Sequence, residues 1–337
     1  MVRIMKEGSL NAWKTTTVDF YFSILMIRSI SCDYLRKLLH LNYTRKTNKY
    51  QYFINIMKQL IYLTLLCITR VTGSYTQTNS HQYDINTVNT DLIFKYPDTT
   101  NNIFLRALRN EYKLSELTQN KSTDIDKVLS VLNWTHNQWK HNGSNEPSKS
   151  DALTILKEAK EGKTFRCVEY GIVLTSALQA LNFKARVVGL KTADVETKKY
   201  GAGHVLAEVW MPQFDKWVLI DGQFNVMPIL DNIPLNAVEF RQAISANKKY
   251  KLIDVNGEVS KLSAKMYTKF VFDYLYFIDA RFDNRNDSAD QRVVHEGKST
   301  LMLVPLGVKN PTVFQVKYPM DNLFYTNSIN DFYRKPN

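Results

Sequence analysis

The chain has 337 residues, of which 44% are hydrophobic and 23% charged, so it is long enough for one large globular domain or two small ones. Its formal net charge of +12 is concentrated at the start: residues 1–73 hold 11 of the 44 Lys and Arg but only 3 of the 32 Asp and Glu. Residues 74–337 hold the remaining 33 basic and 29 acidic residues, a net charge of +4. The basic composition therefore does not indicate a nucleic-acid-binding surface.

Residues 57–73 have the layout of a secretory signal peptide. Met57 is followed by Lys58, an apolar core over 60–68 and the small residue Gly73. The core is too short to span a bilayer, so no integral membrane span is expected. We therefore expect a secreted, periplasmic or cell-surface protein whose mature chain begins near Ser74. Residues 1–56 would be a leader, or the product of an upstream start codon chosen in error.

Two alternatives to the signal peptide are a hydrophobic helix of the folded protein and a lipid anchor on Cys67. The chain has three cysteines, Cys32, Cys67 and Cys167. If the mature chain begins near Ser74, Cys167 is left alone and cannot form an internal disulfide. An unpaired Cys in an exported protein is a candidate reactive thiol.

The next segments lead into a predicted core domain over residues 101–230. Residues 74–100 are rich in Asn, Thr, Gln and Tyr and are expected to form a linker. Apolar periodicity then predicts three helices with a loop before the third, at residues 103–117, 123–139 and 151–160. His136 and His141 are expected at a polar helix end, and no metal or cofactor site is predicted.

A further helix is predicted to begin near Cys167, with Thr164 as a possible cap and Asn182 as a plausible end. One face of this helix collects small and apolar residues at spacings of three and four: Cys167, Gly171, Leu174, Leu178 and Leu181. Cys167 would thus lie in the first turn and face inward. Unpaired backbone N–H groups at a helix N-terminus favour a thiolate.

Three strands are predicted after this helix, over 184–190, 204–211 and 217–221. A hairpin register that pairs Glu208 with Trp217 also places His204 directly opposite Asp221, with Cβ atoms about 5 Å apart. We expect this pair to lie beside the N-terminus of the Cys167 helix. Each residue also has an ordinary interpretation: a small buried hydrophobe, a sheet residue and a turn residue.

Beyond the three strands, helices are predicted over 235–246 and 261–272. Strands are predicted over 250–255, 275–282, 299–306 and 312–318. Residues 231–337 would extend the same sheet or form a small second domain.

Two stretches resemble the transglutaminase-like superfamily. FRCVEYGIVLTSALQALNFKARVVG is similar to its Cys helix and following Ala-Arg strand, with Asn182 where Gly is usual. GHVLAEVWMPQFDKWVLIDGQFN is similar to its His strand and Asp strand. The resemblance covers roughly residues 125–230. It implies a papain-like α+β fold in which a Cys at a helix N-terminus packs on an antiparallel sheet that carries His and Asp.

The same resemblance implies Cys167 as nucleophile, His204 as base and Asp221 as the residue that orients the imidazole. The implied activity is that of a thiol enzyme acting on amide or peptide bonds of a protein or peptide through an acyl-enzyme, with hydrolysis favoured over transamidation. Gln138 and Trp139 are candidates for an oxyanion donor beside the Cys167 amide. The alternative is a non-catalytic binding or structural module on the same fold.

Overall fold

The computed structural model describes Met57 and residues 81–285 and 292–336. The chain divides into two compact units, Met1–Thr76 and Gln77–Asn337, and the fold described below belongs to the second. The predicted leader, the signal peptide beyond Met57, Cys32 and Cys67 lie outside the described residues. Within the part of the chain that is described, no helix combines the length and apolar character needed to cross a membrane.

The first five described helices are α3 (Ile103–Glu111), α4 (Leu114–Thr118), α5 (Asp124–His136), α6 (Ala152–Lys160) and α7 (Cys167–Ala180). The sequence predicted one helix over 103–117, but Lys113 has a left-handed backbone (φ 50°) that divides it into α3 and α4. Thr123 caps α5 by accepting a hydrogen bond from Asp126 N, and Asp151 caps α6 through Thr154 N. These caps fix where the two helices begin.

Six strands form the main sheet, in the order β12-β9-β8-β1-β2-β3. They are β1 (Ala185–Lys191), β2 (Gly203–Met211), β3 (Lys216–Ile220), β8 (Phe277–Arg281), β9 (Thr300–Leu303) and β12 (Leu323–Thr326). Only the pairing of β12 with β9 is parallel within this sheet. Three strands from beyond residue 231 therefore continue the sheet that β1, β2 and β3 begin.

A second sheet has the order β5-β4-β6-β7, with β4 (Met227–Leu230), β5 (Ile233–Pro234), β6 (Lys251–Asp254) and β7 (Gly257–Glu258). The helices α8 (Ala237–Ser245), α9 (Lys261–Val271) and α10 (Ile329–Phe332) complete the C-terminal part. The single strand predicted over 312–318 is wrong: Val313–Phe314 (β10) and Tyr318–Pro319 (β11) form a small hairpin. Positive φ at Gln315 and Val316 reverses the chain between them.

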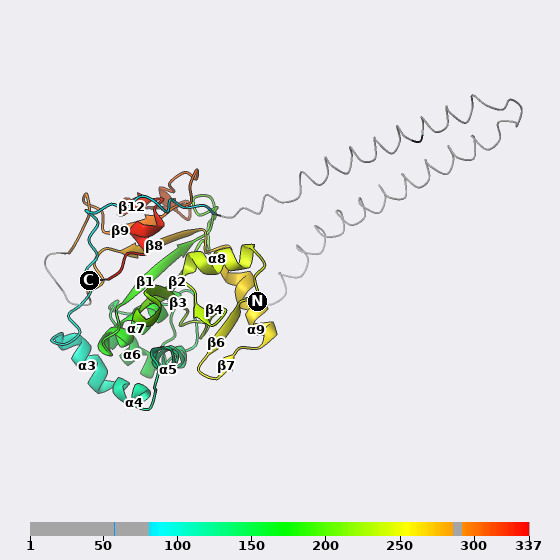
Figure 1. Ribbon diagram of the computed structural model, residues 1–337. Coiled ribbons are helices and arrows are strands. Elements are labelled where there is room, and N and C mark those ends of the chain that lie inside the picture. Colours follow the sequence, from blue (N-terminus) through cyan, green and yellow to red (C-terminus); the bar gives the residue numbers. More distant parts are fainter. Residues whose placement is uncertain (1–56, 58–80, 286–291, 337) are drawn as a thin grey trace, which may run out of the picture. The chain divides into compact units, whose positions relative to one another are not determined.

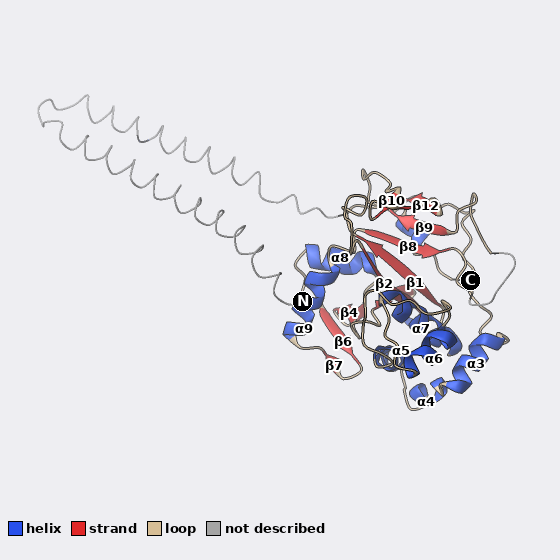
Figure 2. Cartoon of the chain, turned by 180° about the vertical axis from the view of Figure 1, so that it is seen from behind, coloured by secondary structure: helices blue, strands red, loops and turns tan. Residues whose placement is uncertain are grey.

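The main sheet is covered on both faces (Figures 1 and 2). Helices α3–α7 pack on the face that carries Ala207, Val209 and Ile220. The opposite face, with Leu206 and Leu219, packs against α8, α9 and the C-terminal strands. The predicted α+β fold, with a Cys-bearing helix on an antiparallel sheet, is confirmed.

The close approach of α7 to β2 depends on Gly171. A Cβ at this position would lie 2.9 Å from Val205 Cγ1 and 3.3 Å from the Leu206 carbonyl oxygen. Glycine therefore lets α7 lie directly against β2 at Gly171, one turn after Cys167 and close to His204 near the start of the strand.

Residues 81–100, within the segment expected to be a linker, run irregularly along the domain. Leu92 and Phe94 are buried in the same hydrophobic cluster as α8 and α9. Backbone bridges join Asp84 to Ser328 and Lys95 to Asp283. This segment thus contributes to the core of the second unit.

Candidate active site

Cys167 is the first residue of α7 and is partly exposed. The predicted cap at Thr164 is wrong, because Arg166 is the N-cap residue and its backbone N–H donates to Glu169 Oε2 at 3.0 Å. The Glu169 carboxylate is fully buried and also pairs with the Arg166 guanidinium at 2.8 Å. The helix ends at Ala180, and Asn182 follows with a left-handed φ of 70°, in keeping with its predicted stop.

The predicted register of the β2–β3 hairpin is shifted by two residues. Trp210 pairs with Trp217, and Glu208 pairs with Leu219 rather than with Trp217. A shift of two keeps every side chain on its face, because strand side chains alternate with a period of two. Asp221, just beyond β3, therefore stays on the His204 face but lies diagonally across from His204.

The structure brings His204 and Asp221 into direct contact, with His204 Nε2 2.8 Å from Asp221 Oδ2. Both side chains are buried. Burial on its own would lower the pKa of His204, but the Asp221 charge, its hydrogen bond and a hydrogen bond with Cys167 raise that pKa to about 10. A raised pKa favours the imidazolium form, in which Nε2–H donates to Asp221 and the Nδ1–H is left for another acceptor.

Asp221 is held by three donors besides His204. Its Oδ1 accepts hydrogen bonds from the backbone of Gln223 at 3.0 Å and Phe224 at 3.2 Å. Its Oδ2 accepts one from the Tyr267 hydroxyl at 3.1 Å. Burial, and then the Asp221 charge, raise the pKa of Tyr267, so the phenol stays protonated and keeps donating. The carboxylate is thus fixed in one orientation.

Tyr267 lies on α9, and no pattern in the sequence singled it out. Helix α9 and the residues just after it supply two of the three aromatic rings around the His204 imidazole. Phe270 and Tyr274 have ring centroids 5.2 and 5.8 Å from that of His204, and Phe224 lies at 6.1 Å. Burial, followed by the Cys167 charge, raises the pKa of Tyr274, which places this ring near the thiol as well. The rings shield the His204–Asp221 pair from water.

The two oxyanion candidates differ in what their side chains do. The Gln138 amide, just beyond the end of α5, donates to the Trp134 carbonyl in the last turn of that helix at 2.8 Å. Trp139 is buried between Phe165 and Tyr170, with ring centroids at 5.7 and 4.4 Å. Its indole Nε1 is a buried donor without a partner among the described residues. Trp139 is therefore the candidate with a free N–H beside the segment that carries Cys167.

His136 and His141, expected only at a polar helix end, both border the site. His136 Nδ1 is 3.3 Å from the carbonyl oxygen of Gly222, the residue after Asp221. Burial, and next the positive charge of His204, lower the pKa of His141. Among the described residues, no three His, Cys, Asp or Glu side chains are grouped as metal ligands.

Residues 112–222 match the family model of the transglutaminase-like superfamily. The matched stretch includes Cys167, His204 and Asp221, so the transglutaminase-like domain that the chain carries contains all three residues. A comparison with curated proteins finds no match.

Several solved structures are similar to parts of the chain. A candidate cysteine protease from Cytophaga hutchinsonii is 14% identical, with a TM-score of 0.31 over 43% of this chain and 46% of that one. The periplasmic domain of TgpA from Pseudomonas aeruginosa is 19% identical, with a TM-score of 0.29 over 39% and 47%. This chain therefore matches less than half the length of either protein.

Proposed function

We propose that this protein is a thiol enzyme that acts on amide or peptide bonds through an acyl-enzyme, with Cys167 as nucleophile. The observation that carries the proposal is the contact between His204 and Asp221, which leaves one imidazole nitrogen for the thiol at the start of α7. A nucleophile, a base and a group that orients the base are the three parts such chemistry requires.

The reaction begins once the Cys167 thiol has lost its proton, so that a thiolate lies beside the His204 imidazolium. The sulfur attacks the substrate carbonyl carbon, and the C=O electron pair moves to oxygen. When the tetrahedral intermediate collapses, the C–N bond breaks and His204 gives its proton to the leaving amine. Water then attacks the thioester while His204 accepts a proton from it. The products are a carboxylic acid and the regenerated thiolate.

Two N–H groups are suited to stabilise the oxyanion, namely the Cys167 backbone amide and the unpartnered Trp139 indole Nε1. Preorganised donors of this kind are worth roughly 10²–10³ in rate each. Asp221 keeps the imidazole in the tautomer and orientation that direct Nδ1 to the sulfur. Tyr267 in turn keeps Asp221 in place.

Hydrolysis is favoured over transamidation because Cys167 is partly exposed, so water can reach the thioester. Cross-linking would require a second, amine-bearing substrate and a site that excludes water. The proposed substrate is therefore a protein or peptide and the second reactant is water.

The proposal is tested by labelling the purified protein with iodoacetamide at neutral pH and mapping the modified peptides. We expect rapid labelling at Cys167 that slows strongly in His204→Ala. A peptide-library digest should show cleavage by the wild type and none by Cys167→Ala, whose folding is checked by circular dichroism. If Cys167 labels only on unfolding and no peptide is cleaved, the domain is a non-catalytic binding module.

We also propose that the protein is exported by a signal peptide over residues 57–73. N-terminal sequencing of exported material should find a first residue near Ser74. Protein that begins at Met1 and stays in the cytosol would contradict this proposal.

A further inference from the structure

Arg241 is a buried cation on α8; the charge of Asp273 acts on its pKa, but no acidic side chain of the described residues forms an ion pair with it. Its side chain is only 7% exposed, and its Nη1 donates to the Phe272 carbonyl at 2.7 Å. The guanidinium also lies over the Phe272 ring at 4.5 Å. Among the ion pairs formed by the described residues, none includes Arg241. Buried arginines are normally paired, as Arg186 is with Glu208 in this same domain.

The groups that Arg241 contacts, the Phe272 carbonyl and the His81 imidazole, accept its hydrogen bonds but carry no negative charge. His81 Nε2 lies 3.5 Å from Arg241 Nη2 and must be the acceptor, because a guanidinium has no lone pair to offer. The His81 proton is then on Nδ1. Burial, and next the charge of Arg241, lower the pKa of His81 to about 4, so this imidazole is neutral.

Three polar atoms in this cluster are buried without a partner among the described residues: Arg241 Nε, His81 Nδ1 and Tyr83 Oη. Tyr83 is 8% exposed. Burial raises the pKa of Tyr83, so its hydroxyl keeps its proton and can donate. Buried polar groups without partners are costly, and here one of the three N–H or O–H groups belongs to the cation itself and the other two are neutral donors from His81 and Tyr83. The missing partner is an acceptor with negative charge.

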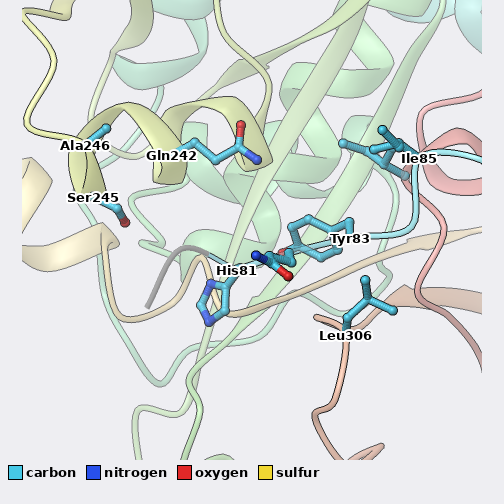
Figure 3. Close-up of a pocket in the computed structure, with 9 residues that line it drawn as sticks. His81, Tyr83, Ile85, Gln242, Ser245, Ala246 and Leu306 are labelled. Carbon is cyan, nitrogen blue, oxygen red and sulfur yellow. The ribbon is translucent and has the colours of Figure 1, made fainter. Parts of the chain in front are cut away.

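An open pocket of about 480 Å³ adjoins this cluster. His81 and Tyr83 lie between the α8 residues Gln242 and Ser245 on one side and Ile85 and Leu306 on the other (Figure 3). The pocket therefore has a polar side next to Arg241 and an apolar side. Its volume is in the range of pockets that hold small organic ligands, about 300–1,000 Å³.

We propose that this pocket binds a small organic monocarboxylate. The carboxylate would take the hydrogen bonds of the donor cluster, and the apolar part of the molecule would lie against Ile85 and Leu306. One cation calls for a single negative charge, which favours a carboxylate over a phosphate dianion. The pocket lining includes none of Cys167, His204 or Asp221, so this site stands independently of the proposed thiol chemistry.

The test is calorimetric titration of the full chain with hexanoate, alongside hexanamide as a neutral analogue and inorganic phosphate. We expect saturable one-to-one binding of hexanoate, and at least tenfold weaker binding of the other two. Tyr83→Phe removes only the hydroxyl and should weaken hexanoate binding about tenfold. Arg241→Gln should abolish hexanoate binding. If the Arg241→Gln variant does not fold, the result for Tyr83→Phe decides the proposal.

Tyr112→Phe is the matched control, because Tyr112 also has a buried hydroxyl without a partner but lies next to α3, outside the pocket. It should leave the hexanoate Kd unchanged. Cys167→Ala should also bind hexanoate like the wild type, so loss of catalysis and loss of this site are distinguishable. The proposal is overturned if the wild type shows no saturable hexanoate binding, binds hexanamide equally well, or responds alike to the two Tyr→Phe changes.

Discussion

Strand β2 contributes to two buried polar pairs on one face of the sheet. The pairs differ in whether all of their hydrogen-bonding groups are occupied by neighbouring protein groups. His204 and Glu208 are four residues apart, so they point the same way. His204 pairs with Asp221 at 2.8 Å, and Glu208 pairs with Arg186 at 2.7 Å. All four side chains are buried. Burial and charge are therefore shared by both pairs and do not by themselves mark a reactive site.

In the Arg186–Glu208 pair, neighbouring groups contact both side chains, and we call it the closed pair. Arg186 Nη1 donates to the Phe332 carbonyl at 2.8 Å, and its guanidinium lies over the Trp217 ring at 4.4 Å. The second oxygen of Glu208 accepts the Tyr333 hydroxyl at 3.1 Å. This network ties the centre of the sheet to the C-terminal residues, and both carboxylate oxygens are occupied.

In the His204–Asp221 pair, only the Asp221 carboxylate is fully hydrogen-bonded, and we call it the open pair. Asp221 is surrounded by donors, but the imidazole keeps one nitrogen for Cys167, which is partly exposed. The difference shows that a buried pair becomes a candidate for chemistry when one of its groups still faces a nucleophile that substrate can reach.

Asp221→Asn should give the largest effect on the open pair. The amide can hold His204 in the wrong tautomer, so we expect kcat to fall by about 10⁴-fold while the fold is retained. Peptide cleavage kinetics and circular dichroism measure the two quantities. Unchanged turnover would mean that Asp221 only shapes the turn after β3.

Glu208→Gln should show the opposite pattern on the closed pair. It leaves the Arg186 charge buried without compensation, which typically costs about 3–5 kcal/mol of the free energy of unfolding. Urea denaturation measures this loss, and Cys167 labelling of the folded protein should not change. Glu258→Gln is the control: its pair with Lys251, at 3.0 Å, is exposed and should be worth less than about 1 kcal/mol.

The open pair should also make stability depend on pH. The folded-state pKa of His204 is raised to about 10 from an ordinary value of 6.5. Between these values the folded protein holds a proton that the unfolded chain lacks, so the stabilisation is complete below pH 6.5 and is lost as pH rises through about 10. The difference in free energy of unfolding between wild type and His204→Gln should shrink across this window. A difference that stays constant would refute the assigned charge state.

Tyr267→Phe should give the smallest effect, because the hydroxyl acts on catalysis only through Asp221. Loss of one hydrogen bond to a buried carboxylate should lower kcat about tenfold with little change in KM. Tyr250→Phe is a matched control, since its hydroxyl bonds Thr268 on the same helix at 3.0 Å but lies away from Asp221. Equal effects of the two changes would assign Tyr267 a role in stability alone.

Local patterns in the sequence predicted several parts of the site correctly. The three-four spacing placed Cys167 in the first turn of a helix, and strand alternation placed His204 and Asp221 on one face. The register was wrong by two because it would pair Met211 with Phe214, whereas the structure leaves four residues, 212–215, between Met211 and its partner. Pro212–Phe214 form a turn of 3-10 helix, and Asp215 takes a left-handed φ of 49°, so Met211 pairs with Lys216. The error did not change the face, because two is the period of a strand.

What the sequence determined by itself is the order of the elements, the start of α7 at Cys167, and the shared face of His204 and Asp221. These features follow from periodicities of a few residues, which local backbone geometry imposes. The tertiary structure alone decided that Tyr267, 46 positions from Asp221, would hold its carboxylate, and that Arg241 would be buried beside His81. Contacts between distant segments depend on how the helices pack across the sheet, and no short-range pattern encodes that packing.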